Sequence, residues 1–358
     1  MEFRDLESKR YSKSLADREV AAPPTVQPAA RCVAGRLKCP AVEMARKIRF
    51  TPDGGAFYEV TCRTVHSRLL LRPGPLLNEI IVGALGRAQR LYSLEICAFV
   101  FASNHFHLLA RVEDSERLAR FMGYFNSKLA RKVARSTGWR DKVFSRRYQA
   151  ILVSDEEEAQ VGRLVYVLSH GCKENLVARP QDWPGIHCVT ALLTGEPIVG
   201  TWFDRTKEWE ARRRGEEFGA RQFADTEVVD LSPLPCWRHL AGERYRERIA
   251  ELVEAIIAQA AARREATGIE PLGAVEILRQ QPFSQPAKTK KSPAPLVHAA
   301  SKRVRIEMKI AYRWFVKAFR EAAEYLRAGD RLARFPRGSF PPGLPFVRAG
   351  RLAVRPAT

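Results

Sequence analysis

The hydrophobic residues between positions 56 and 112 repeat with two different periods, which divide this part of the chain into four elements. The run AFYEVTCRTV, residues 56–65, is rich in β-branched and aromatic side chains and follows the turn PDGG, so it predicts a strand. The run LLNEIIVGALGRAQRLY, residues 76–92, has apolar residues at helical spacing. LEICAFVF (94–101) and HFHLLARV (105–112) are two apolar runs joined by the short turn ASN, which predicts a β-hairpin.

The alternation of strands and helices continues to residue 177. Residues 114–139 predict an amphipathic helix, VFSRRYQAILV (143–153) a fourth strand, and residues 154–177 a second long helix that starts with a capping box of Ser154 and Glu157. The order is β-α-β-β-α-β-α, and its first six elements match the ferredoxin-like βαββαβ arrangement, an antiparallel sheet with two helices on one face. We therefore predict an α+β domain over residues 46–195, in which the last helix is an addition to the basic fold.

The two ends of the chain carry different patterns. Residues 1–45 mix charges with the Pro/Ala segment AAPPTVQPAA and predict a flexible leader. Residues 196–358 predict a basic, mostly helical C-terminal region, with long helices in RYRERIAELVEAIIAQAAARREATG (244–268) and SKRVRIEMKIAYRWFVKAFREAAEYLRAG (301–329). The stretch near residues 281–297 is basic and rich in proline, so we expect a linker there.

The charge balance narrows the class of partner. The chain has 60 Lys and Arg against 40 Asp and Glu, a net charge of +20, which indicates a polyanionic partner or an anionic membrane surface. No apolar run is long enough to span a bilayer, and the charged N-terminus has no signal-peptide core, so we expect nucleic acid as the partner and a cytoplasmic location. The seven cysteines are scattered without a CxxC pair, which predicts reduced thiols.

Two short segments carry residues that suit phosphoryl chemistry. His105 and His107 fall on the same face of their predicted strand, because side chains alternate along a strand. Tyr166 and His170 are one helical turn apart, opposite the apolar stripe of their predicted helix. If that helix faces the strand, three imidazoles converge beside a phenol. Imidazoles can hold a divalent ion that polarises a phosphoryl oxygen, and a tyrosine can attack phosphorus and become covalently attached.

These segments resemble a known family. NHFHLL, residues 104–109, resembles the HUH motif of single-tyrosine transposases. YVLSHGCKENLVARPQDWPG, residues 166–185, is similar to the nucleophile helix of the REP-associated tyrosine transposases. The resemblance covers about residues 46–190 and implies that His105 and His107 are metal ligands and that Tyr166 is the nucleophile.

The sequence departs from the family pattern at several positions. The fourth residue after the tyrosine is commonly a polar Asn or Gln ligand in the family, and here it is His170, which we predict to be the third metal ligand. The usual Asn-Pro pair is His170-Gly171, and the Met-Pro pair before the Asn-His is Ala102-Ser103. A histidine is a better metal ligand than an amide, so the first departure strengthens the predicted metal site.

The resemblance implies an activity. The family cleaves and rejoins single-stranded DNA at imperfect hairpins, uses Mg2+ or Mn2+, and passes through a 5′-phosphotyrosine link. The cofactor expected here is therefore a divalent Mg2+ or Mn2+, and the oligomeric state, monomer or homodimer, stays open. Basic residues supply most of the affinity for a nucleic-acid backbone. The candidates in this domain are Arg63, Arg131, Lys132, Arg135, Arg140, Arg146, Arg147 and Lys173.

Simpler explanations exist for each residue. His105 and His107 could be a hydrogen-bonded pair on a half-buried strand, His170 a surface residue near a helix end, and Tyr166 a packing residue. Tyr148 is a rival nucleophile, although it falls on a predicted strand. The alternative function is a catalytically inactive, domesticated hairpin-DNA-binding regulator of the same fold. An RRM-like RNA binder lacks the required aromatic pattern. We favour the enzyme because every catalytic position holds a competent residue.

Overall fold

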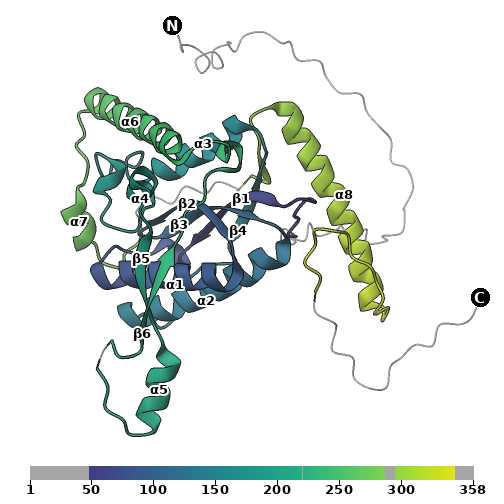
Figure 1. Ribbon diagram of the computed structural model, residues 1–358, viewed down its shortest axis with the longest axis horizontal. Helices are drawn as coiled ribbons and strands as arrows, with labels where there is room; N and C mark the ends of the chain where they lie inside the picture. Colours follow the sequence, from purple (N-terminus) through teal and green to yellow (C-terminus); the bar gives the residue numbers. More distant parts are fainter. Residues whose placement is uncertain (1–47, 220, 287–294, 343–358) are drawn as a thin grey trace, which may run out of the picture. The chain divides into compact units, whose positions relative to one another are not determined.

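A five-stranded sheet lies at the centre of the part of the chain that the computed structural model describes, which is residues 48–219, 221–286 and 295–342 (Figure 1). The strand order is β2-β3-β1-β4-β7. The strands are β1 (Ala56–Arg63), β2 (Glu95–Ala102), β3 (His105–Val112), β4 (Gln149–Val153) and β7 (Val297–His298). Strand β1 pairs antiparallel with both β3 and β4, whereas β7 runs parallel to β4 at the edge. The predicted leader lies outside the described residues.

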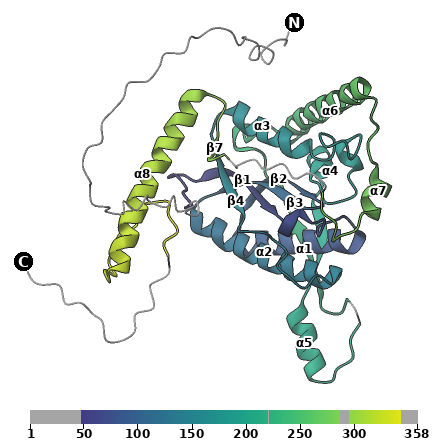
Figure 2. The ribbon, with the colours of Figure 1, turned by 180° about the vertical axis from the view of Figure 1, so that it is seen from behind.

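Helices cover both faces of this sheet. Helices α1 (Pro75–Tyr92) and α2 (Ser115–Thr137) lie on one face, and α3 (Glu157–Leu168) lies on the other (Figures 1 and 2). The element order from β1 to α3 is the predicted β-α-β-β-α-β-α, and the strands β2-β3-β1-β4 have the ferredoxin-like arrangement. The predicted α+β fold of this domain is therefore confirmed.

Strand β3 separates the hydrophobic core from the polar residues of interest. Its side chains alternate, so Phe106 points toward α2, where its ring centroid lies 5.6 Å from that of Phe125. His107 points the other way, and its ring centroid lies 5.3 Å from that of Tyr166 on α3. The apolar face of this strand thus builds the core, and its other face presents two imidazoles to α3.

Two predicted boundaries were wrong. The fourth strand begins at Gln149 rather than at residue 143, because residues 145–147 are exposed and only Phe144 forms an isolated bridge, to Thr64. The second long helix ends at Leu168 rather than at residue 177, and Gly171 adopts a left-handed φ of 89° that a helix cannot continue through. His170 consequently lies in the turn that follows α3.

The predicted capping box at the start of α3 does not form. The N-cap residue is Glu156, and the hydroxyl of Ser154 donates to the carboxylate of Glu156 instead of capping the helix. The residues that the structure describes also contain short 3-10 turns at Val65–Ser67, Pro180–Asp182 and Pro235–Trp237.

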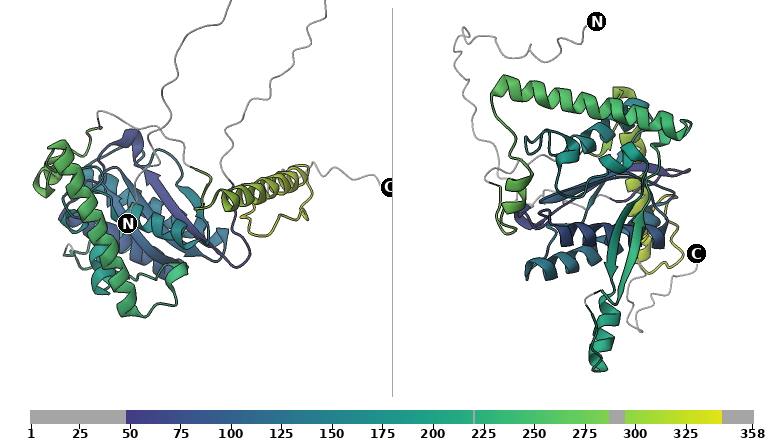
Figure 3. Two further views of the ribbon diagram at one scale, coloured as in Figure 1. Left: turned by 90° about the horizontal axis from the view of Figure 1, so that it is seen from above. Right: turned by 60° about the vertical axis from the view of Figure 1, so that its left-hand side comes forward.

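The C-terminal region has the predicted helices and a hairpin that the sequence did not predict. Its helices are α5 (Arg205–Arg213), α6 (Gly242–Thr267), α7 (Ala274–Arg279) and α8 (Lys302–Arg327), and α4 (Val189–Thr194) lies just before the region, at the end of the central domain. Strands β5 (Ile198–Phe203) and β6 (Ala224–Val229) form the hairpin, which packs against α1 (Figure 3). This packing requires glycine in α1, because a Cβ on Gly83 would lie only 2.0 Å from the carbonyl oxygen of Thr201. Of the stretch predicted as a linker near 281–297, residues 287–294 lie outside the described residues, and Val297 is the first residue of strand β7.

Membrane-spanning helices are absent from the described ranges, where no helix combines the length and the apolar character that crossing a bilayer requires.

Candidate active site

Three histidines from two elements converge on the α3 face of the sheet. His105 and His107 come from β3, and His170 comes from the turn after α3. Each offers a ring nitrogen, and these nitrogens lie within 4.8 Å of one another. The ring centroid of His170 lies 5.5 Å from that of His105 and 4.6 Å from that of His107. The structure thus brings together the three residues that the sequence predicted as metal ligands.

Hydrogen bonds at Nδ1 orient all three rings in the same sense. The Nδ1 of His105 donates to Oδ1 of Asn104 at 2.6 Å, and the Nδ1 of His107 donates to Oε1 of Glu59 at 2.8 Å. The Nδ1 of His170 donates to the carbonyl oxygen of Tyr166 at 2.9 Å. These oxygens can only accept, so the proton of each neutral ring sits on Nδ1 and the lone pair on Nε2. This is the arrangement in which second partners fix histidines that bind metal ions.

Burial keeps the imidazoles neutral. It lowers the pKa of His105 and of His170 well below the usual value, and the charge of neighbouring His107 acts in the same direction on both. Burial also lowers the pKa of His107, although the hydrogen bond to Glu59 opposes that effect. A neutral imidazole is the form that binds a metal ion, so the triad is suited to a divalent cation.

Tyr166 lies beside the histidines and between two cations. Its ring centroid is 5.0 Å from that of His170. The guanidinium carbon of Arg163 lies 4.3 Å from the Tyr166 centroid, and the ammonium of Lys173 lies 3.4 Å from it. Burial and the charge of Glu59 raise the pKa of the Tyr166 phenol, whereas the charges of Arg163 and Arg63 oppose this shift. The pKa is raised overall, so the nearby positive charges offset only part of the cost of forming a phenolate at this position.

Lys173 is itself perturbed by the site. Burial lowers its pKa to about 8, although Glu174 opposes the shift. Its ammonium lies 3.2 Å from Nε2 of His170 and 3.5 Å from the carbonyl oxygen of Tyr166. The lysine therefore contacts both Tyr166 and His170.

Glu59 is a residue of the candidate site that was not predicted from the sequence. It lies on β1 with its side chain 3% exposed, and it accepts hydrogen bonds from His107, Arg163 and His298. Burial alone would raise the pKa of Glu59, but the hydrogen bonds from His107 and His298 and the charge of Arg163 hold it far below its usual value. The signal in the sequence was one acidic residue inside the apolar strand AFYEVTCR.

The predicted DNA-binding residues fall into separate groups. Arg63 is opposite His105 in the β1–β3 pairing, and the charges of Arg63 and Lys173 help to lower the pKa of His105, so these two residues lie next to the histidines. Arg146 is exposed in the loop between α2 and β4, and its charge acts on Arg63. Arg140 and Arg147 are exposed in the loop between α2 and β4. The remaining three residues lie on α2, on the other face of the sheet. These three residues are Arg131, Lys132 and Arg135. They line a cavity of about 400 Å³, and the other lining residues are Leu76, Ile80, Ser136 and Arg205.

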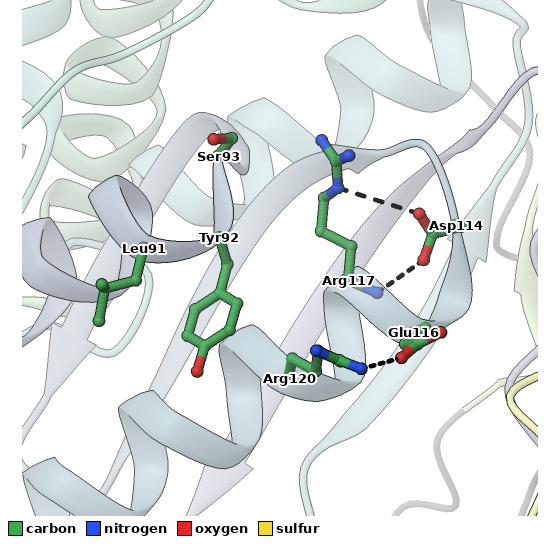
Figure 4. Close-up of a pocket in the computed structure, with 7 residues that line it drawn as sticks. All are labelled: Leu91, Tyr92, Ser93, Asp114, Glu116, Arg117 and Arg120. Carbon is green, nitrogen blue, oxygen red and sulfur yellow. Dashed lines mark hydrogen bonds and ion pairs between the residues drawn. The ribbon is translucent and has the colours of Figure 1, made fainter.

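A second pocket lies at the end of α1 and the start of α2, and its charges neutralise one another (Figure 4). Asp114 caps α2 by accepting from the backbone amide of Arg117 and also faces the Arg117 side chain at 3.9 Å. Arg120 pairs with Glu116 one turn earlier. None of the residues predicted for catalysis or DNA binding lines this pocket.

Tyr148, the rival candidate for the nucleophile, is buried, and its hydroxyl is engaged by a residue outside the histidine triad. Its hydroxyl accepts a hydrogen bond from Nε of Arg49 at 2.8 Å. Its side chain is 6% exposed, which leaves little room for a phosphate at the hydroxyl. The structure therefore places Tyr166, and not Tyr148, next to the three imidazoles.

Comparison with known proteins identifies the central domain. Residues 76–167 match the family model described as Transposase IS200 like. The matched segment contains His105, His107 and Tyr166, and its similarity to transposases of that kind supports the resemblance seen in the sequence. Among curated proteins, none matches the chain.

Two solved structures are similar to parts of this chain. One is the structure of the REP-associated tyrosine transposase bound to a REP hairpin, with 17% identity, coverage of 42% of this chain and 85% of that chain, and a TM-score of 0.33. The other is a transposase candidate from Deinococcus radiodurans R1, with 16% identity, coverage of 31% of this chain and 89% of that chain, and a TM-score of 0.25.

Proposed function

We propose that this transposase domain is a metal-dependent single-stranded DNA endonuclease and strand transferase that works through a covalent 5′-phosphotyrosine at Tyr166. The observation that carries the proposal is the arrangement of the histidines. Three neutral imidazoles have their Nδ1 atoms hydrogen-bonded to fixed acceptors. The Nε2 lone pairs of His105 and His107 remain for a cation beside the phenol, and that of His170 becomes available when the Lys173 ammonium, at 3.2 Å, moves away. A packing role for these histidines would not require three rings in the same tautomer within reach of one another.

His105, His107 and His170 are the proposed ligands of Mg2+ or Mn2+. When bound, the ion supplies Lewis-acid polarisation of a phosphoryl oxygen. Three nitrogen donors suit a transition metal better than Mg2+, which prefers oxygen ligands. We therefore expect Mn2+ to bind more tightly than Mg2+ at this site.

The bond changes are a transesterification. The phenol oxygen of Tyr166 attacks phosphorus and loses its proton, a Tyr–O–P bond to the 5′ phosphate forms, and the P–O3′ bond breaks. The leaving oxygen takes up a proton and becomes a free 3′ hydroxyl, and attack by such a hydroxyl on the phosphotyrosine reverses the step and joins strands. Arg163 supports the phenolate across the ring face. Lys173 would turn from Nε2 of His170 toward the phosphate, since one nitrogen lone pair cannot hold two cations.

The proposed substrate is hairpin-forming single-stranded DNA with palindromic repeats, and it follows from the resemblance of residues 166–185 to the REP-associated tyrosine transposases. Arg63 and Lys173, next to the histidines, and Arg146, whose charge acts on Arg63, are the proposed contacts for the phosphates of a strand that enters the site. The net charge of +20 favours such a backbone. Cytoplasmic location, with direct access to DNA, is part of the same proposal.

A covalent-adduct assay tests the proposal. The purified chain is incubated with 5′- or 3′-labelled repeat hairpins in Mn2+, in Mg2+ or in a chelator, and adducts are separated on denaturing gels. We expect a metal-dependent adduct that carries the DNA 3′ of the cut, and its loss below detection in Tyr166→Phe with unchanged hairpin binding. Tyr148→Phe is the matched control and should retain the adduct. Hairpin binding without any adduct in the wild type would instead indicate the inactive regulator.

A further inference from the structure

Strand β7 brings a residue of the C-terminal region next to the histidine triad. Nε2 of His298 lies 2.9 Å from Oε2 of Glu59, the carboxylate that holds Nδ1 of His107 through its other oxygen. The matched transposase segment ends at residue 167, so His298 lies far outside it. The chain of contacts therefore runs from the C-terminal region through Glu59 to a proposed metal ligand.

The backbone around His298 is held firmly at the start of α3. The amide of Ser154 donates to the carbonyl oxygen of His298 at 2.9 Å, and Val297 is buried. The carboxylate of Glu156, the N-cap residue of α3, accepts from the amides of Ala300 at 2.9 Å and Ser301 at 3.0 Å. These contacts place the imidazole of His298 beside the sheet, so its approach to Glu59 does not depend on a free loop.

The carboxylate of Glu59 has its two oxygens committed to different partners. Oε1 accepts from His107, and Oε2 accepts from both His298 at 2.9 Å and Arg163 at 3.2 Å. Arg163 and His298 approach each other to 3.3 Å because both donate to this one oxygen. Without His298, Oε2 would be held by Arg163 alone, on the helix that also carries Tyr166. The carboxylate would then lose one of the two contacts that set its rotation against His107.

We propose that His298 is a positioning residue for the metal centre: it fixes the carboxylate of Glu59, and Glu59 in turn fixes the tautomer and direction of His107. The C-terminal region is then part of the catalytic apparatus of this chain. The inference rests on the proposed function, since it concerns the affinity of the triad for its cation. Partners of a ligand histidine typically change metal affinity by about 10- to 100-fold, and we expect the lower end because His298 acts through Glu59.

The test measures Mn2+ binding to the full chain by calorimetry and by the EPR spectrum of the bound ion. His298→Leu should weaken Mn2+ binding about tenfold and alter the EPR spectrum. His298→Gln should restore binding to within about twofold, because its carboxamide nitrogen can occupy the position of Nε2 and donate to Glu59. His239→Leu, the same change at an exposed histidine, should leave binding unchanged.

Val297→Ala separates the side chain of His298 from the packing of its strand. It removes buried apolar contact from β7 and leaves the hydrogen bond to Glu59 in place. If it weakens Mn2+ binding as much as His298→Leu does, or if His298→Gln fails to restore binding, strand packing explains the effect and the inference is overturned. Thermal melting without metal checks that each variant folds. If His298→Leu does not fold, His298→Asn replaces it, because the amide of asparagine is too short to reach Glu59.

The outcomes for this inference and for the proposed function are distinct. If the wild type binds Mn2+ and His298→Leu binds it equally well, the inference fails and the proposed metal site stands. If the wild type itself binds no Mn2+, the proposed function fails, and the role of His298 fails with it.

Discussion

The two faces of strand β3 use adjacent residues for different purposes. On the face toward α2, Phe106 is fully buried among aromatic rings and makes no polar contact of its side chain. On the face toward α3, His107 is nearly as buried, but its ring is held by a hydrogen bond to Glu59. One face therefore contributes stability through packing, and the other gives up apolar burial in order to hold a neutral imidazole in one direction.

The comparison teaches how buried polar residues are tolerated in this fold. A buried polar atom without a partner costs free energy, so each histidine of the triad needs a specific acceptor. A buried polar group also occurs in the helical layer on the other face of the sheet, where its partners are a backbone carbonyl and an aromatic ring. Lys132 of α2 is 9% exposed, and its ammonium donates to the carbonyl oxygen of Phe203 at 2.9 Å and lies 4.2 Å from the ring centroid of Trp202.

The largest expected effect on stability comes from the packing face. Phe106→Ala should lower the free energy of unfolding by about 3–5 kcal/mol, because it leaves a cavity in the core. His107→Ala should cost only about 1–2 kcal/mol, since it removes a single buried hydrogen bond, while Mn2+ binding is lost. Urea unfolding monitored by circular dichroism measures both. An equal decrease in the free energy of unfolding for the two variants would show that the α2 face of β3 does not contribute more stability than the α3 face.

A smaller effect is expected from the carboxylate behind the histidines. Glu59→Gln should weaken Mn2+ binding by about 10- to 100-fold, because the neutral amide polarises His107 less and its NH2 group would face the donors His298 and Arg163. Calorimetry measures the change. Glu227→Gln is the matched control, as Glu227 is also 3% exposed and is paired with Arg87 and Arg90 away from the site. Weakened binding in both variants would point to a general loss of stability.

The smallest effect concerns Lys132 and pH. Burial lowers its pKa from 10.5 to about 8, and the charge of Arg205 adds to this shift. Between these two pH values the unfolded chain binds more protons than the folded chain, so the stability that Lys132 contributes rises with pH. We expect the free energy of unfolding to rise by about 1–2 kcal/mol from pH 7 to 10.5 through Lys132. This is less than the full pKa shift of Lys132 implies, because its flexible side chain can turn to solvent.

The difference between wild type and Lys132→Met isolates this gain from other groups that titrate in alkali. The variant should be more stable than the wild type at pH 7, and the advantage should shrink toward pH 10.5. Urea midpoints measured at several pH values check it. A constant difference across this range would show that Lys132 is not desolvated in the folded chain.

Much of the central domain could be predicted from local patterns. The positions of α1, α2, β2 and β3 follow from hydrophobic periodicity, which depends on residues a few positions apart. The same periodicities placed His105 and His107 on one face of a strand and Tyr166 on one face of a helix, whereas the structure shows that these two faces meet. The end of α3 could not be placed in this way, since Gly171 stops the helix only through its backbone conformation.

The sequence by itself determined the α+β element order, the shared face of His105 and His107, and the basic charge of the chain. Only the tertiary structure decided that Glu59 accepts a hydrogen bond from His107 and contacts His298 through its other oxygen. It also decided that the basic residues of α2 lie on the other face of the sheet from the triad. The physical reason is distance along the chain. A hydrophobic period of two or of 3.6 residues can be recognised from residues close together in the sequence. The partners of a buried carboxylate come from strands and helices that meet only when the sheet has formed.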